Sequence, residues 1–176
     1  LTPFSILTGA ALLAGYALLG ATWLVAKTEG DLQGWARRWA FGLALAVVGF
    51  MGAVSLWVPA LDAEIARRWY SWPNLLYLSL VPLLVAATTA GLVAALLAGR
   101  PLLPFLAAIG LFLLGFAGLA ISLWPNVVPP SVSIWDAASD PASQAFVLVG
   151  VAVLLPVILA YTAWSYWVFR GKVDPD

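Results

Sequence analysis

The chain has 176 residues, of which 64% are hydrophobic and 9% charged, with a formal net charge of zero and a mean hydropathy of +1.01. A soluble globular domain is close to half apolar and a quarter charged, so this composition excludes one, and the balanced charge gives no indication of a nucleic-acid partner. The sequence contains no His, no Cys and a single Met, which excludes a disulfide framework and a thiolate metal site.

The 16 charged residues fall into five short clusters, and each segment between clusters is long enough to cross a bilayer. The clusters occupy residues 27–38, 62–68, 100, 136–140 and 170–176. The charge-free segments are 1–26, 39–61, 69–99, 101–135 and 141–169. A spanning helix needs about 20 predominantly apolar residues. The pattern therefore predicts an all-α polytopic membrane protein, with five transmembrane helices packed as a single helix-bundle domain over residues 1–176.

In chain order, the helices are predicted over residues 3–26, 39–59, 74–98, 102–123 and from 141 to near 169. Pro3 is tolerated in the first turn, where the missing N–H has no helical partner. Asp140 is expected to cap the fifth helix, with Pro141 at its first position. Gly171 offers a stop just beyond its C-terminal end.

Prolines interrupt the apolar pattern inside two helices and in one loop. Pro82 and Pro156 fall inside the third and fifth predicted helices and should kink them, since proline removes a helical hydrogen bond. Three prolines within residues 124–130 should end the fourth helix, so residues 131–135 are expected to re-enter the membrane or lie along its surface. Asp136 then either starts the turn toward the fifth helix, or orders this loop or bonds a partner subunit.

Aromatic and small residues occupy regular positions in the predicted helices. Trp and Tyr residues gather near the helix ends, as in the aromatic belts of membrane proteins, although one or two of them could instead line a quinone or lipid-tail site. Small residues lie four apart in four helices, and small side chains let helices approach closely in lipid. These predicted packing seams are Ala11 with Gly15, Gly49 with Ala53, Gly91 with Ala95, and Gly118 with Ser122.

No ionisable residue lies in any of the five predicted spans, where such a group would indicate an ion or proton pathway. Met51 and the tyrosines are the available haem-ligand types, and a lone Met within an apolar helix is interpreted as core filler. We therefore predict no catalytic, cofactor-binding or metal-binding residue in this chain. The polar residues of the spans are expected to bond a neighbouring helix or their own i−4 carbonyl; they are Thr8, Ser55, Ser79, Thr88, Thr89, Ser122 and Thr162.

The distribution of Lys and Arg predicts the orientation in the membrane. Only Arg67 and Arg68 lie on the side of the second loop. The opposite side holds Lys27, Arg37, Arg38, Arg100, Arg170 and Lys172. Six basic residues against two place the C-terminus in the cytoplasm and Leu1 outside. The chain begins without Met or a basic leader, so we expect no uncleaved signal peptide and a start inside a longer protein.

Both ends of the chain resemble subunit II of the cytochrome bd-type quinol oxidases. Residues 1–33, LTPFSILTGAALLAGYALLGATWLVAKTEGDLQ, resemble the fifth-helix region of that subunit. Residues 123–173 resemble its C-terminus, through the string WPNVVPPS, then IWDAAS, then LLPVILAYTAWSYW. The middle of the chain agrees mainly in hydropathy.

The resemblance implies the C-terminal half of a non-haem scaffold subunit. The family is expected to form a bacterial inner-membrane complex that oxidises quinol and reduces oxygen to water. Haems b and d and the quinol site would belong to the partner, subunit I. Whether this half also holds a quinone is left open by the resemblance. The implied partners are subunit I, the N-terminal half of subunit II and membrane lipids. The family's acidic proton-path residues lie in that N-terminal half, so no catalytic residue carries over.

Two other functions remain open from the residues alone. A small-molecule transporter or channel subunit would need several copies, because five helices without charged lining make a poor pore. The other open function is that of an assembly factor or a membrane anchor. Whether the chain is itself part of an enzyme depends on the partner, since no catalytic group is expected in this chain.

Overall fold

The computed structural model of the protein describes residues 2–128 and 131–172. The predictions for Leu1, for the loop residues 129–130 and for the tail 173–176 lie outside these residues. The elements in order are α1 (Pro3–Lys27), α2 (Gly30–Leu61), α3 (Ala63–Tyr70), α4 (Asn74–Leu78), α5 (Leu80–Leu97), α6 (Leu103–Leu123), β1 (Asn126–Val128), β2 (Val132–Ser133) and α7 (Pro141–Val168).

The predicted all-α polytopic fold is confirmed. Within the described residues, five helical segments are long and apolar enough to cross a membrane, with α4 and α5 together making the third. The chain divides into two compact units, one holding α1 to α6 together with Lys172, and the other holding β1, β2 and α7. The single bundle over 1–176 therefore stays a prediction.

The second helix begins earlier than predicted, at Gly30 instead of residue 39. Charged residues mark where a helix leaves the membrane, but they do not end the helix. The turn before α2 is made instead by Gly30, whose φ of +64° suits glycine, and it is closed by Gln33. The Gln33 Nε2 donates to the carbonyls of Val25 at 3.0 Å and Thr28 at 2.8 Å. With 32 residues, α2 is roughly 48 Å long and exceeds the roughly 30 Å hydrocarbon layer.

A short helix, α3, occupies the second charged cluster, where no helix was predicted. Asp62 caps it, since its Oδ1 accepts a hydrogen bond from the Glu64 amide at 2.8 Å. Arg67 and Arg68 lie in its last turn, where their positive charge interacts favourably with the helix dipole and stabilises the helix. Ile65 is buried, so α3 has one apolar side and one charged side.

The third span is interrupted at Ser79, between α4 and α5, three residues before Pro82, which agrees with the distortion predicted for this proline. Pro82 thus lies in the first turn of α5, and because it has no N–H it cannot donate to the carbonyl of Leu78 at the end of α4. The Ser79 hydroxyl donates to the Leu76 carbonyl at 2.7 Å, which satisfies a backbone group at the break. The other interior proline, Pro156, lies within α7, which continues past it to Val168.

The helix α5 ends in a Schellman motif, a common C-terminal arrangement of helices. Gly99 takes the left-handed conformation, with a φ of +71°, and the Arg100 amide donates to the Ala95 carbonyl at 3.0 Å. The Gly99 amide donates to the Leu96 carbonyl at 3.3 Å. This motif turns the chain sharply into α6.

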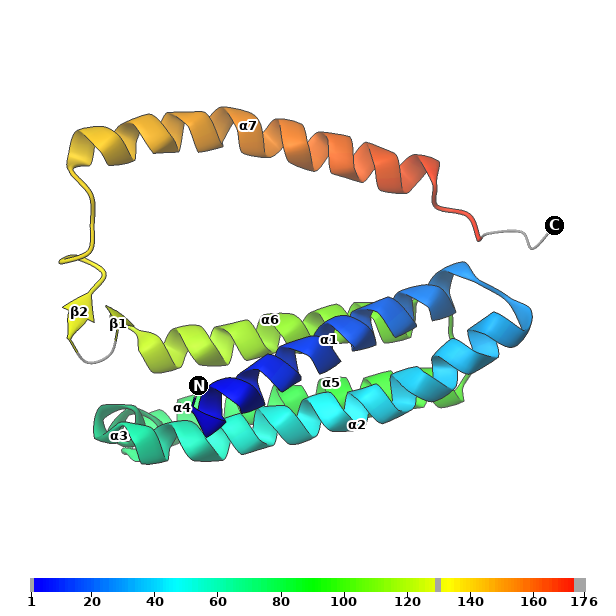
Figure 1. Cartoon of the computed structure of the whole chain (residues 1–176), viewed down its shortest axis with the longest axis horizontal. Helices are drawn as coiled ribbons and strands as arrows, with labels where there is room; N and C mark the ends of the chain where they lie inside the picture. Colours follow the sequence, from blue (N-terminus) through cyan, green and yellow to red (C-terminus); the bar gives the residue numbers. More distant parts are fainter. Residues whose placement is uncertain (1, 129–130, 173–176) are drawn as a thin grey trace. The chain divides into compact units, whose positions relative to one another are not determined.

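The core of the first unit lies where α1, α2, α5 and α6 run side by side (Figure 1). Leu18, Leu92 and Leu111 are its largest apolar side chains and are almost fully buried. Two alanines and one valine of α2 face this core, and the remaining buried residues of the cluster come from α1, α5 and α6. The cluster is Leu18, Ala21, Ala40, Ala44, Val47, Leu92, Leu96, Ala108 and Leu111. Because lipid tails are as apolar as these residues, close van der Waals packing holds the helices together.

The second unit consists of a small hairpin and a long helix. In the hairpin, β1 pairs antiparallel with β2, with Asn126 opposite Ser133 and Val128 opposite Val132. The predicted end of the fourth helix before the prolines is confirmed, because α6 stops at Leu123. The helix α7 contains no buried residue; Gly150 and Ser165 are partly buried, and its other residues are exposed.

Candidate functional site

The described residues do not gather into a catalytic or metal-binding centre. No group of three or more His, Cys, Asp or Glu side chains is close enough to hold a metal ion in this part of the chain. Met51 packs against the core, and its Cε lies 3.6 Å from where a Cβ on Gly115 would be. The prediction that Met51 fills the core is therefore confirmed. The residues that carry charge lie at the ends of the helices.

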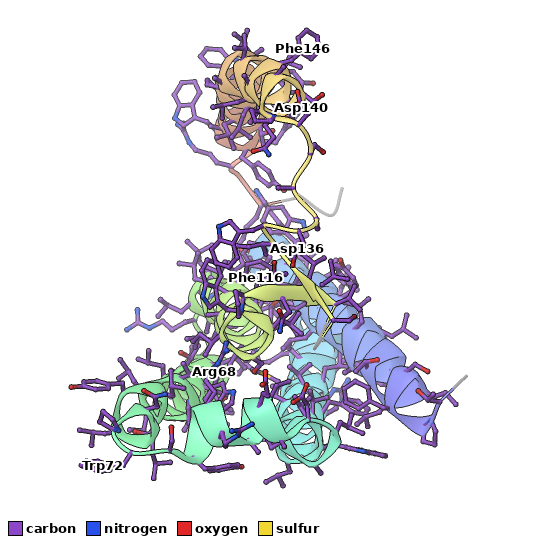
Figure 2. The ribbon with its side chains drawn as sticks, turned by 90° about the vertical axis from the view of Figure 1, so that its left-hand side faces the viewer. Arg68, Trp72, Phe116, Asp136, Asp140 and Phe146 are labelled. Atoms are coloured by element: carbon purple, nitrogen blue, oxygen red, sulfur yellow. The ribbon has the colours of Figure 1, made fainter. Side chains whose placement is uncertain are left out.

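The charged side of α3 forms the most organised of these ends. The Arg68 Nη1 donates to the carbonyl of Ile121 at 2.8 Å, near the C-terminal end of α6 (Figure 2). The adjacent Trp69 Nε1 donates to the Ser122 hydroxyl at 3.0 Å, and that hydroxyl donates to the Gly118 carbonyl at 2.8 Å. A cation near the C-terminal end of a helix also interacts favourably with the helix dipole. These contacts fasten α3 to α6, more than fifty residues later in the chain.

An open recess of about 320 Å³ lies on the outward side of α3 and the start of α4. Its lining residues are polar or charged: Glu64, Arg67, Arg68, Ser71 and Asn74. Neither the Glu64 carboxylate nor the Arg67 guanidinium makes a hydrogen bond or an ion pair with any residue that the structure describes. Sequence reasoning missed this site, although the cap residue Asp62 and the apolar spacing of Ile65 and Trp69 are signals of an amphipathic helix.

At the opposite end of the first unit, basic side chains lie against backbone and rings. The Lys27 Nζ is 5.1 Å from the centre of the Trp23 ring, within the range of a cation–π contact. An Arg37 nitrogen, Nη1, lies 3.3 Å from where a Cβ on Gly99 would be, so a larger residue at position 99 would crowd it. The Arg37 side chain of α2 therefore lies close to Gly99, in the loop before α6.

Lys172 forms an ion pair with Glu29 in the loop before α2. The Lys172 Nζ lies 2.8 Å from the Glu29 Oε1. The hydrogen bond that Lys172 donates, and its positive charge, lower the pKa of Glu29 below its usual value. Both side chains are exposed, so solvent and salt screen their attraction.

We expect this ion pair to make a small, pH-dependent contribution to stability. A carboxyl whose pKa is lower in the folded protein stabilises it above the unfolded pKa, and this contribution is lost as the pH falls through the folded value. Lys172→Gln should therefore lower the melting temperature slightly at neutral pH and not in acid below the pKa of Glu29. Arg38→Gln is the matched control, and scanning fluorimetry at several pH values measures both. A Lys172→Gln difference that persisted unchanged in strong acid would contradict the assignment.

In the second unit, the hairpin loop is ordered by its own side chains. The Asp136 Oδ2 accepts hydrogen bonds from the Ser133 hydroxyl at 2.5 Å and from the Ser133 amide at 3.3 Å. The Trp124 and Trp135 rings meet edge to face with centroids 5.8 Å apart. The Ile134 amide donates to the Pro125 carbonyl at 2.9 Å. Of the roles predicted for Asp136, ordering of this loop is confirmed, and a bond to a partner subunit stays a prediction.

The ends of α7 follow the predicted pattern. The Asp140 Oδ2 accepts a hydrogen bond from the Ala142 amide at 3.0 Å, which confirms the predicted cap. Near the other end, the Arg170 guanidinium lies 4.8 Å from the centre of the Trp167 ring, which in turn packs on Trp164. Tryptophan with an adjacent cation is typical of the membrane–water interface.

The polar residues of the spans were predicted to bond a neighbouring helix or their own i−4 carbonyl, and Thr89 and Ser122 confirm the i−4 bond. Thr89 and Ser122 donate to carbonyls four residues earlier, at 2.7 and 2.8 Å. Thr8 and Ser79 donate to carbonyls three residues earlier. Thr22, which is completely buried, also donates to the carbonyl four residues before it, at 2.8 Å. These side chains satisfy backbone groups and leave no polar pathway among themselves.

The predicted seams of small residues differ from one another. A Cβ on Gly15 would lie 2.8 Å from the Phe112 Cζ, so the Phe112 ring of α6 packs against α1 where glycine leaves room for it. A Cβ on Gly118 would make ordinary contact with Val81 at 3.8 Å. Among the described residues nothing lies within 4 Å of a Cβ on Gly49 or Gly91. The prediction is therefore wrong for these two glycines as contacts inside the chain, since both face outward.

The chain matches the family described as cytochrome bd terminal oxidase subunit II over residues 1–169. It is 27% identical to the cytochrome bd-I ubiquinol oxidase subunit 2 of Escherichia coli K12 over 213 aligned positions, which cover 100% of this chain and 54% of the relative. A probable cytochrome oxidase subunit 2 of Haemophilus influenzae is 26% identical, with the same shares covered. The chain thus spans about half the length of the curated relatives it matches.

Proposed function

Because the chain belongs to the family of cytochrome bd terminal oxidase subunit II, we propose that it is the non-haem scaffold of a quinol-oxidising terminal oxidase. In this proposal the complex oxidises quinol and reduces oxygen to water, and haems b and d lie in a partner, subunit I. Family membership and the apolar helices make the chain part of a multi-pass subunit of the bacterial inner membrane. The match over residues 1–169 is the observation that carries the proposal.

The chemistry of the chain supports a scaffold role. Its sequence offers no His or Cys as an axial haem ligand, and its one Met fills the core of the first unit. Its outward surface is apolar over long stretches, with exposed fractions of 65% for Leu113, 70% for Phe116 and 82% for Phe146. Surfaces of this kind suit lipid or the apolar helices of other membrane subunits. The N-terminal half of subunit II is proposed as one such partner, since the chain spans 54% of its relatives.

The proposal is tested by separating haem binding from assembly. The chain purified alone is expected to bind no haem, whereas the assembled complex should contain the haems and consume oxygen with quinol. Visible spectra report haem content, and oxygen uptake normalised to haem reports turnover. Stoichiometric haem retained by the isolated chain, or quinol-dependent oxygen uptake by it alone, would contradict the scaffold role. A colourless homo-oligomer as the native state would favour the transporter instead.

Gly91 tests assembly through the outer face of α5. Its face is exposed in this chain, so Gly91→Leu should leave the fold of the isolated chain intact. If a partner helix packs there, the yield of haem-containing complex should fall while turnover per haem changes much less. Assembly at the wild-type level would show that this face contacts lipid and not a partner subunit.

The orientation proposed for the chain has its own test. Arg37, Arg38 and Arg170 should face the cytoplasm, and Arg67, Arg68 and Asp136 should face outside, by the excess of basic residues on the cytoplasmic side. The chain has no native Cys, so single cysteines at these positions can be labelled from either face in intact cells or inverted vesicles. Labelling of Asp136→Cys from the cytoplasmic face alone would reverse the assignment.

A further inference from the structure

The recess on α3 lies at the level where lipid headgroups are expected. It lies between the C-terminal end of α2 at Leu61 and the start of α4 at Asn74, and its helix is bonded to the end of α6 at Ile121. Three membrane spans therefore end beside it. The polar layer of a bilayer adds roughly 5–8 Å on each side of the hydrocarbon core, so groups at the ends of spans lie among the headgroups. Trp72, which projects from this end and is 76% exposed, is typical of the same layer (Figure 2).

The opposite charges in this recess are kept apart. Glu64 and Arg67 are three positions apart on a helix, a spacing at which such side chains commonly pair. Here no ion pair forms between them, and neither side chain has another hydrogen-bonding partner among the described residues. Both line the recess, together with Arg68, which is held against the Ile121 carbonyl and adds positive charge beside Arg67. The recess thus has a positive part and a negative part with space between them.

We propose that this recess binds the headgroup of a phosphatidylethanolamine molecule. The lipid phosphate would lie at Arg67, with Arg68 adding to the attraction, and the lipid ammonium would donate hydrogen bonds to the Glu64 carboxylate. A guanidinium suits a phosphate because it presents several N–H donors in a fixed plane. Ser71 and Asn74 complete the lining and can hydrogen-bond the phosphate and ester oxygens.

The volume and surroundings favour a lipid over a soluble molecule. About 320 Å³ is at the lower end of the roughly 300–1,000 Å³ of small-molecule sites, so the recess has room for a headgroup but not for the whole lipid. The residues directly after Asn74 expose apolar side chains along the span, by 45% at Leu75 and 60% at Leu76. Acyl chains running from the recess would cover these side chains, which a free phosphoethanolamine would leave bare.

Headgroup chemistry separates this lipid from its neighbours in the membrane. The trimethylammonium of phosphatidylcholine has no N–H to donate to Glu64. Phosphatidylglycerol has no cation, so the Glu64 carboxylate would lie near its phosphate without a compensating charge. The site should therefore prefer phosphatidylethanolamine to both, and the carboxylate should be the source of the preference.

The test measures which lipid the assembled complex retains. After delipidation in detergent, the complex is mixed with phosphatidylethanolamine, phosphatidylglycerol and phosphatidylcholine of the same acyl chains, and retained lipid is identified by native mass spectrometry. Wild type should retain phosphatidylethanolamine several-fold over each competitor. Glu64→Gln should lower its preference over phosphatidylglycerol by about tenfold, the effect of losing one charge-assisted hydrogen bond, whereas Arg67→Gln should weaken retention of both lipids. Arg38→Gln, an exposed basic residue of α2, should change neither.

Three results would overturn the proposal. The first is equal retention of all three lipids by the wild type, which needs no variant and so cannot be confused with misfolding. The second is an unchanged preference in Glu64→Gln, whose exposed side chain should leave the melting temperature near that of wild type. The third is full displacement of the lipid by soluble phosphoethanolamine at equal concentration, which would assign the recess to the free headgroup compound.

Discussion

Replacing Gly15 by Leu is expected to destabilise the first unit strongly. A Cβ at this position would already lie 2.8 Å from the Phe112 Cζ and 3.0 Å from its Cε2, so a Leu side chain cannot fit without separating α1 from α6 or displacing the Phe112 ring. Overpacking of this kind costs about 1–3 kcal/mol, and Leu adds more atoms than most such changes. The expected result is a clearly lower melting temperature for the purified chain in detergent, and less of it in the membrane fraction.

Gly20 provides the matched control in the same helix. Nothing among the described residues lies within 4 Å of a Cβ on Gly20, and the residue is exposed. Gly20→Leu should therefore leave stability unchanged or raise it by up to about 1 kcal/mol, because Leu favours a helix more than Gly does. Equal loss of stability in both variants would show that glycine matters for helix flexibility and not for the contact with Phe112. Gly15→Ala should give an intermediate loss, since the Phe112 ring can shift by a few tenths of an ångström.

Leu111→Ala is the second change with a large expected effect. The Leu111 side chain is 1% exposed and packs among α1, α2 and α5 in the core cluster. Truncation of a buried Leu costs about 2–5 kcal/mol in soluble proteins, through the lost transfer energy and the cavity that remains. In a membrane the transfer part is small, because the reference environment is also apolar, so we expect about 2 kcal/mol from lost van der Waals contacts.

Leu113→Ala is the control that separates the loss of packing contacts from the change of residue type. Leu113 lies two residues further along α6 and is 65% exposed, so Leu113→Ala removes the same atoms from a lipid-facing position. Unfolding in mixed micelles of increasing denaturing detergent should show a lower midpoint for Leu111→Ala and almost none of this shift for Leu113→Ala. Similar midpoints for both variants would mean that α6 packs with a different face inward.

The spans could be predicted from the sequence because the membrane imposes a simple rule of length and polarity. Every span needs about 20 apolar residues with its backbone bonded internally, and that requirement is visible in each charge-free segment. The rule does not fix where a helix ends in water, which is why α2 begins at Gly30 and not at residue 39. There the conformation of one glycine and the bonds of Gln33 set the boundary.

The contacts between helices could not be predicted in the same way. Gly15 and Gly91 look alike in the sequence, yet only Gly15 faces another helix of this chain, because the face depends on the rotation of each helix in the bundle. The recess on α3 could not be predicted from the sequence either. It depends on the bond from Arg68 to the Ile121 carbonyl, and such a contact across 53 positions leaves no local pattern. By contrast, the cap at Asp140 is local, and the sequence predicted it correctly.

The long terminal helix has a consequence for the order of assembly. From Pro141 to Val168 its 28 residues include no charged side chain. Its backbone hydrogen bonds form within the helix, so it can insert into the bilayer as a stable helix without contacts to any other segment. Insertion and lateral docking are then separate events, in the sense of two-stage membrane folding. A defect in the core around Leu111 should spare the first event, leaving α7 inserted in a molecule that has yet to assemble.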